Sequence, residues 1–83
     1  MRLLITRDGC GDCPAAVELT KGRINEHIEL DRKGQTQGVE ADALLAYYGI
    51  YGSDLVTPCL LTCDDEDVLS RAEGLDAIRE AVT

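Results

Sequence analysis

The order of hydrophobic patterns over residues 2–31 constrains the fold more than any other feature of the sequence. Residues 2–6 form a short apolar run that a turn cluster ends, which indicates a buried strand. Residues 13–22 hold good helix formers, with Pro14 near the start and Gly22 at the end, which indicates a helix. Residues 26–31 alternate polar and apolar, the period of a half-buried strand. Together they predict a βαβ unit, in which a right-handed crossover joins two parallel strands.

The middle of the chain predicts a second helix. A polar loop over residues 32–38 precedes an apolar pattern at helical spacing over residues 39–48, which stops at Gly49. We expect the buried stripe of this helix to consist of Val39, Ala43, Ala46 and Tyr47.

The last third of the chain predicts a hairpin and a closing helix. Residues 56–63 are rich in strand formers, with Pro58 near the beginning, where a sheet accepts proline. Residues 64–67 resemble a hairpin turn and residues 68–71 a return strand. Residues 74–82 form a helical pattern whose apolar stripe contains Leu75, Ile78 and Val82.

The element order is strand, helix, strand, helix, strand, strand, helix, which predicts an α/β fold. We expect a mixed four-stranded sheet with helices on both faces. With 83 residues the chain is too short for a second core, so residues 1–83 are expected to form a single domain. We expect it to be a monomer.

The charge balance restricts the partners. Eight Lys and Arg residues against sixteen Asp and Glu residues give a formal net charge of −8. This field repels phosphate backbones and anionic lipids, so neither nucleic acid nor a membrane is expected as a partner. A solvated acidic surface explains the charge, and steering toward a basic partner protein is the alternative. Because only residues 3–5 form an apolar run near the start, we expect no signal peptide and a cytoplasmic protein.

Cys10 and Cys13 form a C-x-x-C motif between the first strand and the first helix. In the cytoplasm such a pair is more often catalytic or metal-binding than a permanent bridge. We expect Cys10 at or near the helix N-cap and Cys13 about one turn further on. Unpaired N–H groups and the helix dipole would then favour a thiolate, which is the form that attacks disulfides.

Two neighbouring charges oppose each other at this pair. Arg7 stabilises a thiolate at Cys10, whereas Asp12 destabilises it by a similar amount. Since a helix terminus supplies only about 0.3 to 1 kcal/mol, we expect Cys10 to be only modestly acidified and the pair to be fairly reducing.

The other two cysteines, Cys59 and Cys63, allow a zinc alternative, but their spacing in an apolar strand is unlike that of a zinc knuckle. Four positions on a strand separate their Cα atoms by about 13 Å, which is too far for a disulfide between them. We expect both to be buried small hydrophobes. Cys59 follows Pro58, so a secondary redox thiol is its alternative role.

The histidine and the three tyrosines could each have a structural or a functional role. We expect His27 to be a structural residue rather than a ligand or an acid–base catalyst. Packing around the second helix is expected for the tyrosines, although one of them could instead flank a substrate groove; they are Tyr47, Tyr48 and Tyr51.

Three features together resemble a glutaredoxin of the thioredoxin-fold family, over nearly the whole chain. The C-x-x-C motif, here Cys10-Gly11-Asp12-Cys13, opens the first helix. A Thr57-Pro58 pair begins the third strand, and the segment EGLDAIREAV from Glu73 is similar to the Gly-Gly-x-Asp segment that opens the last helix of small glutaredoxins. The resemblance implies a thioredoxin fold of the order βαβαββα.

The resemblance also implies roles for four residues of the active site. Cys10 would be the attacking cysteine, and Cys13 would resolve the mixed disulfide. Pro58 would be cis and lie beside the cysteine pair. The main chain of Thr57 would pair with a bound peptide or with glutathione.

Further residues correspond to glutathione contacts of the family. Arg7 stands where many glutaredoxins carry a Lys, and Gly74 and Asp76 match positions that contact the γ-glutamyl end of glutathione. The usual Pro-Tyr between the cysteines is Gly-Asp here, and Glu73 replaces the first Gly of the Gly-Gly pair. Because Asp12 and Glu73 add negative charge near an anionic tripeptide, a thioredoxin-like protein served by a flavin-dependent thioredoxin reductase stays open.

The function expected from the sequence is thiol–disulfide oxidoreductase activity through the dithiol of Cys10 and Cys13. No metal and no tightly bound organic cofactor is expected, and the electron donor is glutathione or a thioredoxin reductase. The targets would be disulfide-containing proteins, among which the resemblance implies a ribonucleotide reductase. The competing class is a non-enzymatic thioredoxin-fold module that binds a partner or zinc.

Overall fold

The computed structural model describes residues 1–51, 55–65 and 67–83. Within these residues the chain forms four strands and three helices in the predicted order. Their bounds are β1 (Arg2–Arg7), α1 (Cys13–Thr20), β2 (Glu26–Leu30), α2 (Val39–Tyr47), β3 (Cys59–Cys63), β4 (Val68–Glu73) and α3 (Leu75–Val82).

The four strands form one mixed sheet in the order β2-β1-β3-β4. β1 pairs with β2 in parallel, with Leu4 opposite His27, as the βαβ prediction requires. β1 also pairs antiparallel with β3, and β3 with β4, so the hairpin adds two strands on the other side of β1. Among the described residues, the helices are too short and too polar to cross a membrane.

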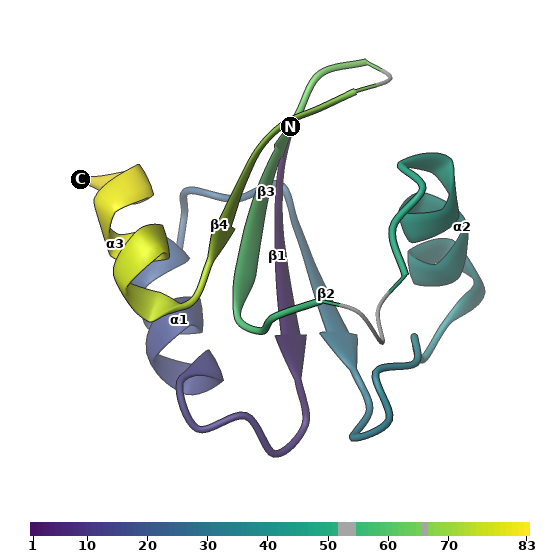
Figure 1. Cartoon of the computed structure of the whole chain (residues 1–83), viewed down its shortest axis with the longest axis horizontal. Helices are drawn as coiled ribbons and strands as arrows, with labels where there is room; N and C mark the ends of the chain where they lie inside the picture. The colour runs from purple at the N-terminus through teal and green to yellow at the C-terminus, as the bar shows by residue number, and fades with distance from the viewer. Residues whose placement is uncertain (52–54, 66) are drawn as a thin grey trace.

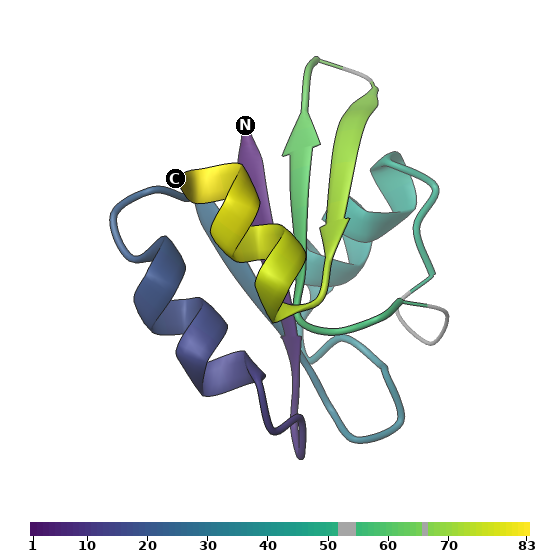
Figure 2. The same ribbon diagram turned by 60° about the vertical axis from the view of Figure 1, so that its left-hand side comes forward.

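Helices cover both faces of the sheet, which confirms the expected layers. α1 and α3 lie together on one face and α2 lies on the other (Figure 1, Figure 2). Because neighbouring side chains of a strand point to opposite faces, Leu3 and Ile5 pack in the core beneath α2, whereas Leu4 packs with Ala16 of α1 and Ile78 of α3.

The predicted buried stripe of α2 is wrong. Val39, Ala43, Ala46 and Tyr47 are all exposed. The helix instead buries Leu45 and packs Ala41, Leu44 and Tyr48 against the same core cluster, a set spaced at i, i+3, i+4 and i+7. The stripe of α3 is as predicted, since Ile78 and Val82 are buried and Leu75 packs against them.

The hairpin differs from its predicted bounds. β3 begins at Cys59 instead of residue 56, because Pro58 has no N–H to donate to the strand ladder. β4 continues to Glu73, two residues beyond the predicted end. The turn between the strands is closed by a bond of 2.8 Å from the N–H of Asp64 to the carbonyl oxygen of Asp67, while Glu66 of the predicted turn lies outside the described residues.

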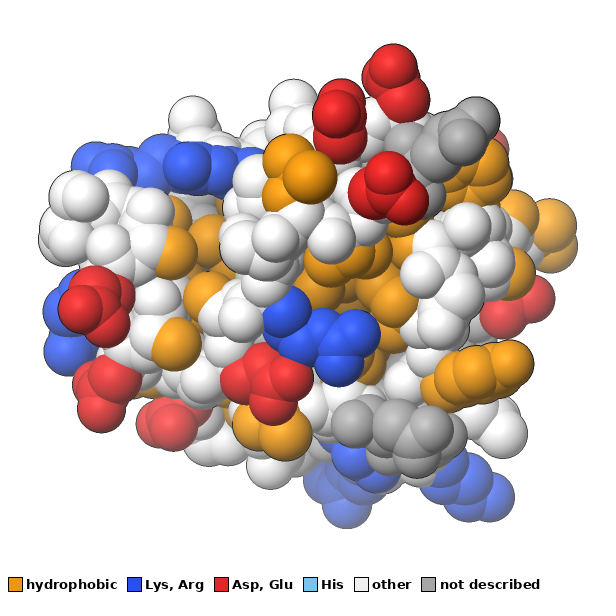
Figure 3. Space-filling model, turned by 45° about the horizontal axis from the view of Figure 1, so that its top comes forward, with side chains coloured by type: hydrophobic (Ala, Val, Ile, Leu, Met, Phe, Trp, Pro, Cys, Tyr) orange, Lys and Arg blue, Asp and Glu red, His pale blue; other side chains and the backbone are white. Residues whose placement is uncertain are grey.

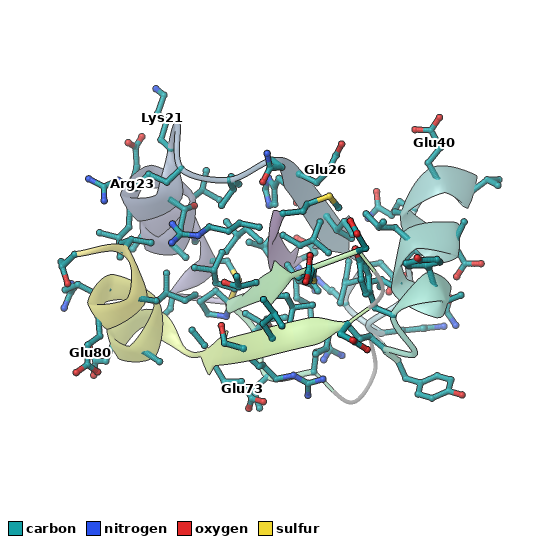
Figure 4. The ribbon with its side chains drawn as sticks, turned by 90° about the horizontal axis from the view of Figure 1, so that it is seen from above. Lys21, Arg23, Glu26, Glu40, Glu73 and Glu80 are labelled. Carbon is teal, nitrogen blue, oxygen red and sulfur yellow. A yellow bond between two sulfur atoms is a disulfide. The ribbon has the colours of Figure 1, made fainter. Side chains whose placement is uncertain are left out.

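Most of the charged side chains that the structure describes are exposed. Figure 4 shows side chains from helices, strands and loops that point away from the core, at Lys21, Arg23, Glu26, Glu40, Glu73 and Glu80. Acidic side chains also gather around the tip of the β3–β4 hairpin, which carries Asp64, Asp65 and Asp67 (Figure 3). This hairpin lies at the opposite end of the sheet from the loop between β1 and α1 (Figure 1).

Candidate active site

Three connections meet at one end of the sheet. The loops that follow β1 and β2 leave the same end, because the carboxyl ends of parallel strands are adjacent, and the segment that enters β3 begins there too (Figure 1). Between them lies an open hollow of about 730 Å³, lined by Arg7, Asp8, Gly9, Cys10, Gly11, Asp12, Arg32 and Thr57. Three segments distant in sequence therefore contribute to one site.

A tight turn after β1 delivers Cys10 into this hollow. The N–H of Cys10 donates to the carbonyl oxygen of Arg7 at 3.1 Å, and Gly9 has a φ of +84°. A positive φ at the third position of a four-residue turn is strained for any residue with a side chain, so the turn requires glycine at position 9.

Cys10 and Cys13 are joined by a disulfide, with their Cα atoms 5.5 Å apart. Cys13 is the first residue of α1 and only 5% exposed, while Cys10 is half-buried in the hollow. The N-cap is Asp12, so Cys10 lies two residues before it, near the N-cap but not at it. Cys10 still has its sulfur at the start of the helix, because the bond to Cys13 holds it there. A thiolate at this place would be stabilised by the positive end of the helix dipole.

The segment before β3 lies against the cysteine pair. The Thr57–Pro58 peptide bond is cis, in agreement with the expectation. The Sγ atom of Cys10 lies 3.6 Å from the carbonyl oxygen of Thr57. In the reduced protein a thiol could donate to this oxygen, whereas a thiolate would be repelled by it. In the reduced protein the Thr57 carbonyl would therefore oppose the helix dipole at the Cys10 sulfur.

Arg32 is a residue of the hollow that the sequence prediction missed. The guanidinium of Arg7 donates to the carbonyl oxygen of Arg32, with an Nε distance of 3.0 Å. The Nε atom of Arg32 in turn lies 3.3 Å from the carboxylate of Asp8. These contacts join the loop that follows β1 to the loop that follows β2. The adjacency of parallel strand ends was the signal that could have placed Arg32 beside Arg7.

The positive and negative side chains that line the hollow are equal in number. Arg7 and Arg32 oppose Asp8 and Asp12, although the whole chain carries a net charge of −8. The excess negative charge therefore lies on other parts of the surface.

Gly74 and Asp76, the two residues that the resemblance relates to glutathione binding, have different surroundings. Gly74 is the N-cap of α3 and donates its N–H to the carbonyl oxygen of Pro58 at 2.8 Å, so it supports the segment beside Cys10. Asp76 is exposed in the first turn of α3, and its carboxylate lies 3.6 Å from the guanidinium of Arg79. Neither Gly74 nor Asp76 is among the described residues that line the hollow.

Cys59 and Cys63 are free thiols in the core beneath α2, as expected for small hydrophobes. Cys59 is 0% exposed, and burial raises the pKa of its thiol to about 11. Burial also raises the pKa of the Cys63 thiol. A buried and protonated thiol is a poor nucleophile, so the structure favours the structural role for Cys59 over a redox role.

Comparisons with protein-family models, with curated proteins and with solved structures found no match. In the part of the chain that the structure describes, the side chains of His, Cys, Asp and Glu form no group of three or more that could hold a metal ion.

Proposed function

We propose that this protein is a thiol–disulfide oxidoreductase of the glutaredoxin type, built on a thioredoxin fold. One observation carries the proposal. Cys10 and Cys13 are bonded to each other at the start of α1, in an open hollow, and the more exposed sulfur faces the main chain of Thr57. A pair that can bond internally and also be reached from solvent can cycle between dithiol and disulfide.

The arrangement of elements supports the same family. The strand order is β2-β1-β3-β4, the dithiol opens α1, and the Thr57–Pro58 segment precedes β3 beside it. These are the positions that the resemblance to glutaredoxins implies for the catalytic pair and for the peptide-binding main chain. Gly74 supports them from the start of α3 through its bond to Pro58.

The reaction starts from the reduced pair. The Cys10 thiolate attacks one sulfur of a target disulfide, which forms a mixed disulfide and releases the other target sulfur as a thiolate that takes up a proton. Cys13 then loses its proton and attacks the Sγ atom of Cys10, which releases the second target thiol. Two electrons have passed to the target, and the bond between Cys10 and Cys13 is the product on the protein.

The different exposure of the two cysteines supports their proposed roles. Cys10 is half-buried in the hollow, whereas Cys13 is 5% exposed and can be reached by Cys10 more readily than by a protein substrate. The donor that reduces the pair again is glutathione or a flavin-dependent thioredoxin reductase. Such a cycle requires a reducing compartment, which supports a cytoplasmic location, and a ribonucleotide reductase is one target that the resemblance implies.

Two cysteine variants test the proposal. With Cys13→Ser, a disulfide substrate should trap the protein as a covalent mixed disulfide through Cys10, detected as a mass increase that dithiothreitol removes. The matched variant Cys10→Ser should accumulate far less adduct, because the buried Cys13 is the poorer nucleophile. Equal adduct in both variants, or none in either, would contradict the assignment.

Turnover identifies the donor. Reduction of hydroxyethyl disulfide and of insulin is followed by NADPH consumption, once with glutathione and glutathione reductase and once with thioredoxin reductase. Activity with the first donor supports the glutaredoxin type, and activity with the second supports a thioredoxin-like reductant. Absence of turnover with both donors would leave the non-enzymatic scaffold as the better explanation.

A further inference from the structure

A second hollow lies beside the first and has no role in the chemistry described above. It measures about 740 Å³ and lies between the loop that follows β2, the helix α2 and the residues just after that helix. We call it the α2 groove. Its lining includes Lys33, Thr36, Val39, Asp42, Leu45 and Tyr51.

The α2 groove combines a buried apolar floor with exposed apolar walls. Leu45 and Ile50 belong to the core and are 3% and 7% exposed. Val39 and Tyr51 also line the groove, yet they are 86% and 74% exposed, the two highest values among the large hydrophobic residues described. Exposed large apolar side chains around a hollow indicate a surface that binds something.

The α2 groove and the hollow at Cys10 are lined by consecutive residues of the loop after β2. Arg32 lines the hollow, and the next residue, Lys33, lines the groove. The wall between them is ordered by Asp31, whose carboxylate accepts bonds of 2.9 Å from the N–H groups of Lys33 and Gln35. The bond from Gln35 is the main reason that the pKa of Asp31 is lowered. The groove is therefore the next hollow along the loop after β2 for a chain that is bound at Cys10 and runs past Arg32.

Charge limits what the groove can hold. Lys33 and Asp42 are its charged residues among those described, and they balance. The chain as a whole carries a net charge of −8, and its acidic hairpin tip contacts the end of α2, where the hydroxyl of Tyr47 donates to the carbonyl oxygen of Asp65 at 2.7 Å. An acidic segment would be repelled by the overall field, whereas an uncharged apolar segment would not be.

On the basis of the proposed function, we propose that the α2 groove binds the polypeptide segment that adjoins a target disulfide. A large uncharged side chain of that segment lies against Leu45 and Ile50, between Val39 and Tyr51. The groove thus selects protein disulfides that carry an apolar residue near the reactive cysteine, over small disulfides and over acidic segments.

The dimensions of the protein limit the spacing. The longest extents of the fold are 30 Å, and an extended chain rises about 3.3 Å per residue, so about nine residues span the whole molecule. The selected apolar residue therefore lies within about nine residues of the target cysteine.

The experiment uses synthetic peptides whose single cysteine is blocked by 2-mercaptoethanol as a mixed disulfide. Leu, Ser or Glu is placed at each position from two to nine residues from that cysteine, in an otherwise Gly/Ser sequence. The kcat/KM of each peptide is measured for the wild type and for Val39→Ser, Tyr51→Ser and Val17→Ser. Val17 is the matched control, since it is also an exposed helical valine but lies on α1.

At one spacing or a few adjacent ones, the wild type should prefer Leu over Ser by about tenfold and should use the Glu peptide least. Val39→Ser and Tyr51→Ser should each reduce this preference to about threefold or less. Val17→Ser should keep it, and all variants should reduce hydroxyethyl disulfide at the wild-type rate.

The possible results distinguish a failure of the proposed oxidoreductase activity from a failure of peptide binding in the groove. Failure of the wild type to reduce hydroxyethyl disulfide with either donor would overturn the proposed function and the groove together. Normal reduction of hydroxyethyl disulfide without a preference for Leu, or with a preference that both groove variants retain, would overturn the groove alone. Sedimentation of a wild-type dimer that Val39→Ser converts to a monomer would also overturn it, because a second copy would then occupy the groove.

Discussion

The buried thiol of Cys59 predicts a pH dependence of stability above pH 9. Its pKa is about 11 in the folded protein, because burial penalises the thiolate, against an ordinary value of 9.0. The folded state therefore keeps a proton that the unfolded state loses between these two values. The resulting stability is fully present below pH 9 and is lost as the pH rises to 11. Two pKa units at about 1.4 kcal/mol each amount to about 3 kcal/mol.

The assay compares the wild type with Cys59→Ala by urea unfolding at pH 8, 9, 10 and 11, with a reductant present throughout. At pH 8 the wild type should be the more stable protein, because the alanine leaves a void in the core. Between pH 9 and pH 11 the wild type should lose about 3 kcal/mol relative to Cys59→Ala. Groups that titrate in both proteins cancel in this difference.

Leu61→Ala is the matched control, because it truncates another fully buried residue of β3 without removing a titrating group. Its free energy difference from the wild type should stay constant over the same range of pH. If the difference between the wild type and Cys59→Ala is also constant from pH 8 to pH 11, the thiol is not held protonated by burial and the reasoning is refuted.

Three further comparisons test the fold and the site. Gly9→Ala should lower the free energy of unfolding by about 1 to 2 kcal/mol because φ is +84° there, and unchanged urea unfolding would contradict the strained turn. Asp12→Asn should raise the reduction potential of the cysteine pair by about 20 to 30 mV in a glutathione redox buffer, since removing this negative charge favours the thiolate; a fall or no change would contradict that effect. Leu61→Ala should cost about 2 to 5 kcal/mol in urea unfolding, while Leu69→Ala, at a site 64% exposed, should cost under about 0.5 kcal/mol, and equal losses would contradict the core assignment.

The elements with one clear periodicity could be predicted from sequence alone. β2 alternates along its length, so only one of its faces can be buried, and Ile28 and Leu30 are the buried residues. α3 has a single apolar stripe among charged residues, so its buried face follows directly from the 3.6-residue period. In both elements local pattern and tertiary burial agree, which is why the prediction holds.

α2 shows where periodicity fails. Its sequence VEADALLAY carries apolar residues around most of the helix, so two different stripes satisfy the same period. The choice between them is made by the sheet, against which Leu45 packs together with Leu3, Ile5 and Ile28. Because that choice depends on residues distant in sequence, the pattern of α2 alone could not decide it.

The candidate site was only partly predictable for the same reason. The sequence identifies Cys10 and Cys13 by their spacing, and the family resemblance adds Thr57 and Pro58. The contact between Cys10 and Thr57 joins residues that are 47 positions apart. Neither that contact nor the tie between Arg7 and Arg32 has a local pattern, because both arise from the order of strands in the sheet.

The contact between Cys10 and Thr57 also affects how Cys10 would be activated. The sulfur lies between the start of α1, which favours a thiolate, and the carbonyl oxygen of Thr57, which favours a thiol. In the proposed function, a backbone N–H of a bound peptide that donates to the Thr57 carbonyl reduces the repulsion between this oxygen and a thiolate. Binding of the correct chain would then promote ionisation of the sulfur that attacks it, so recognition by the main chain and activation of Cys10 would depend on the same atom.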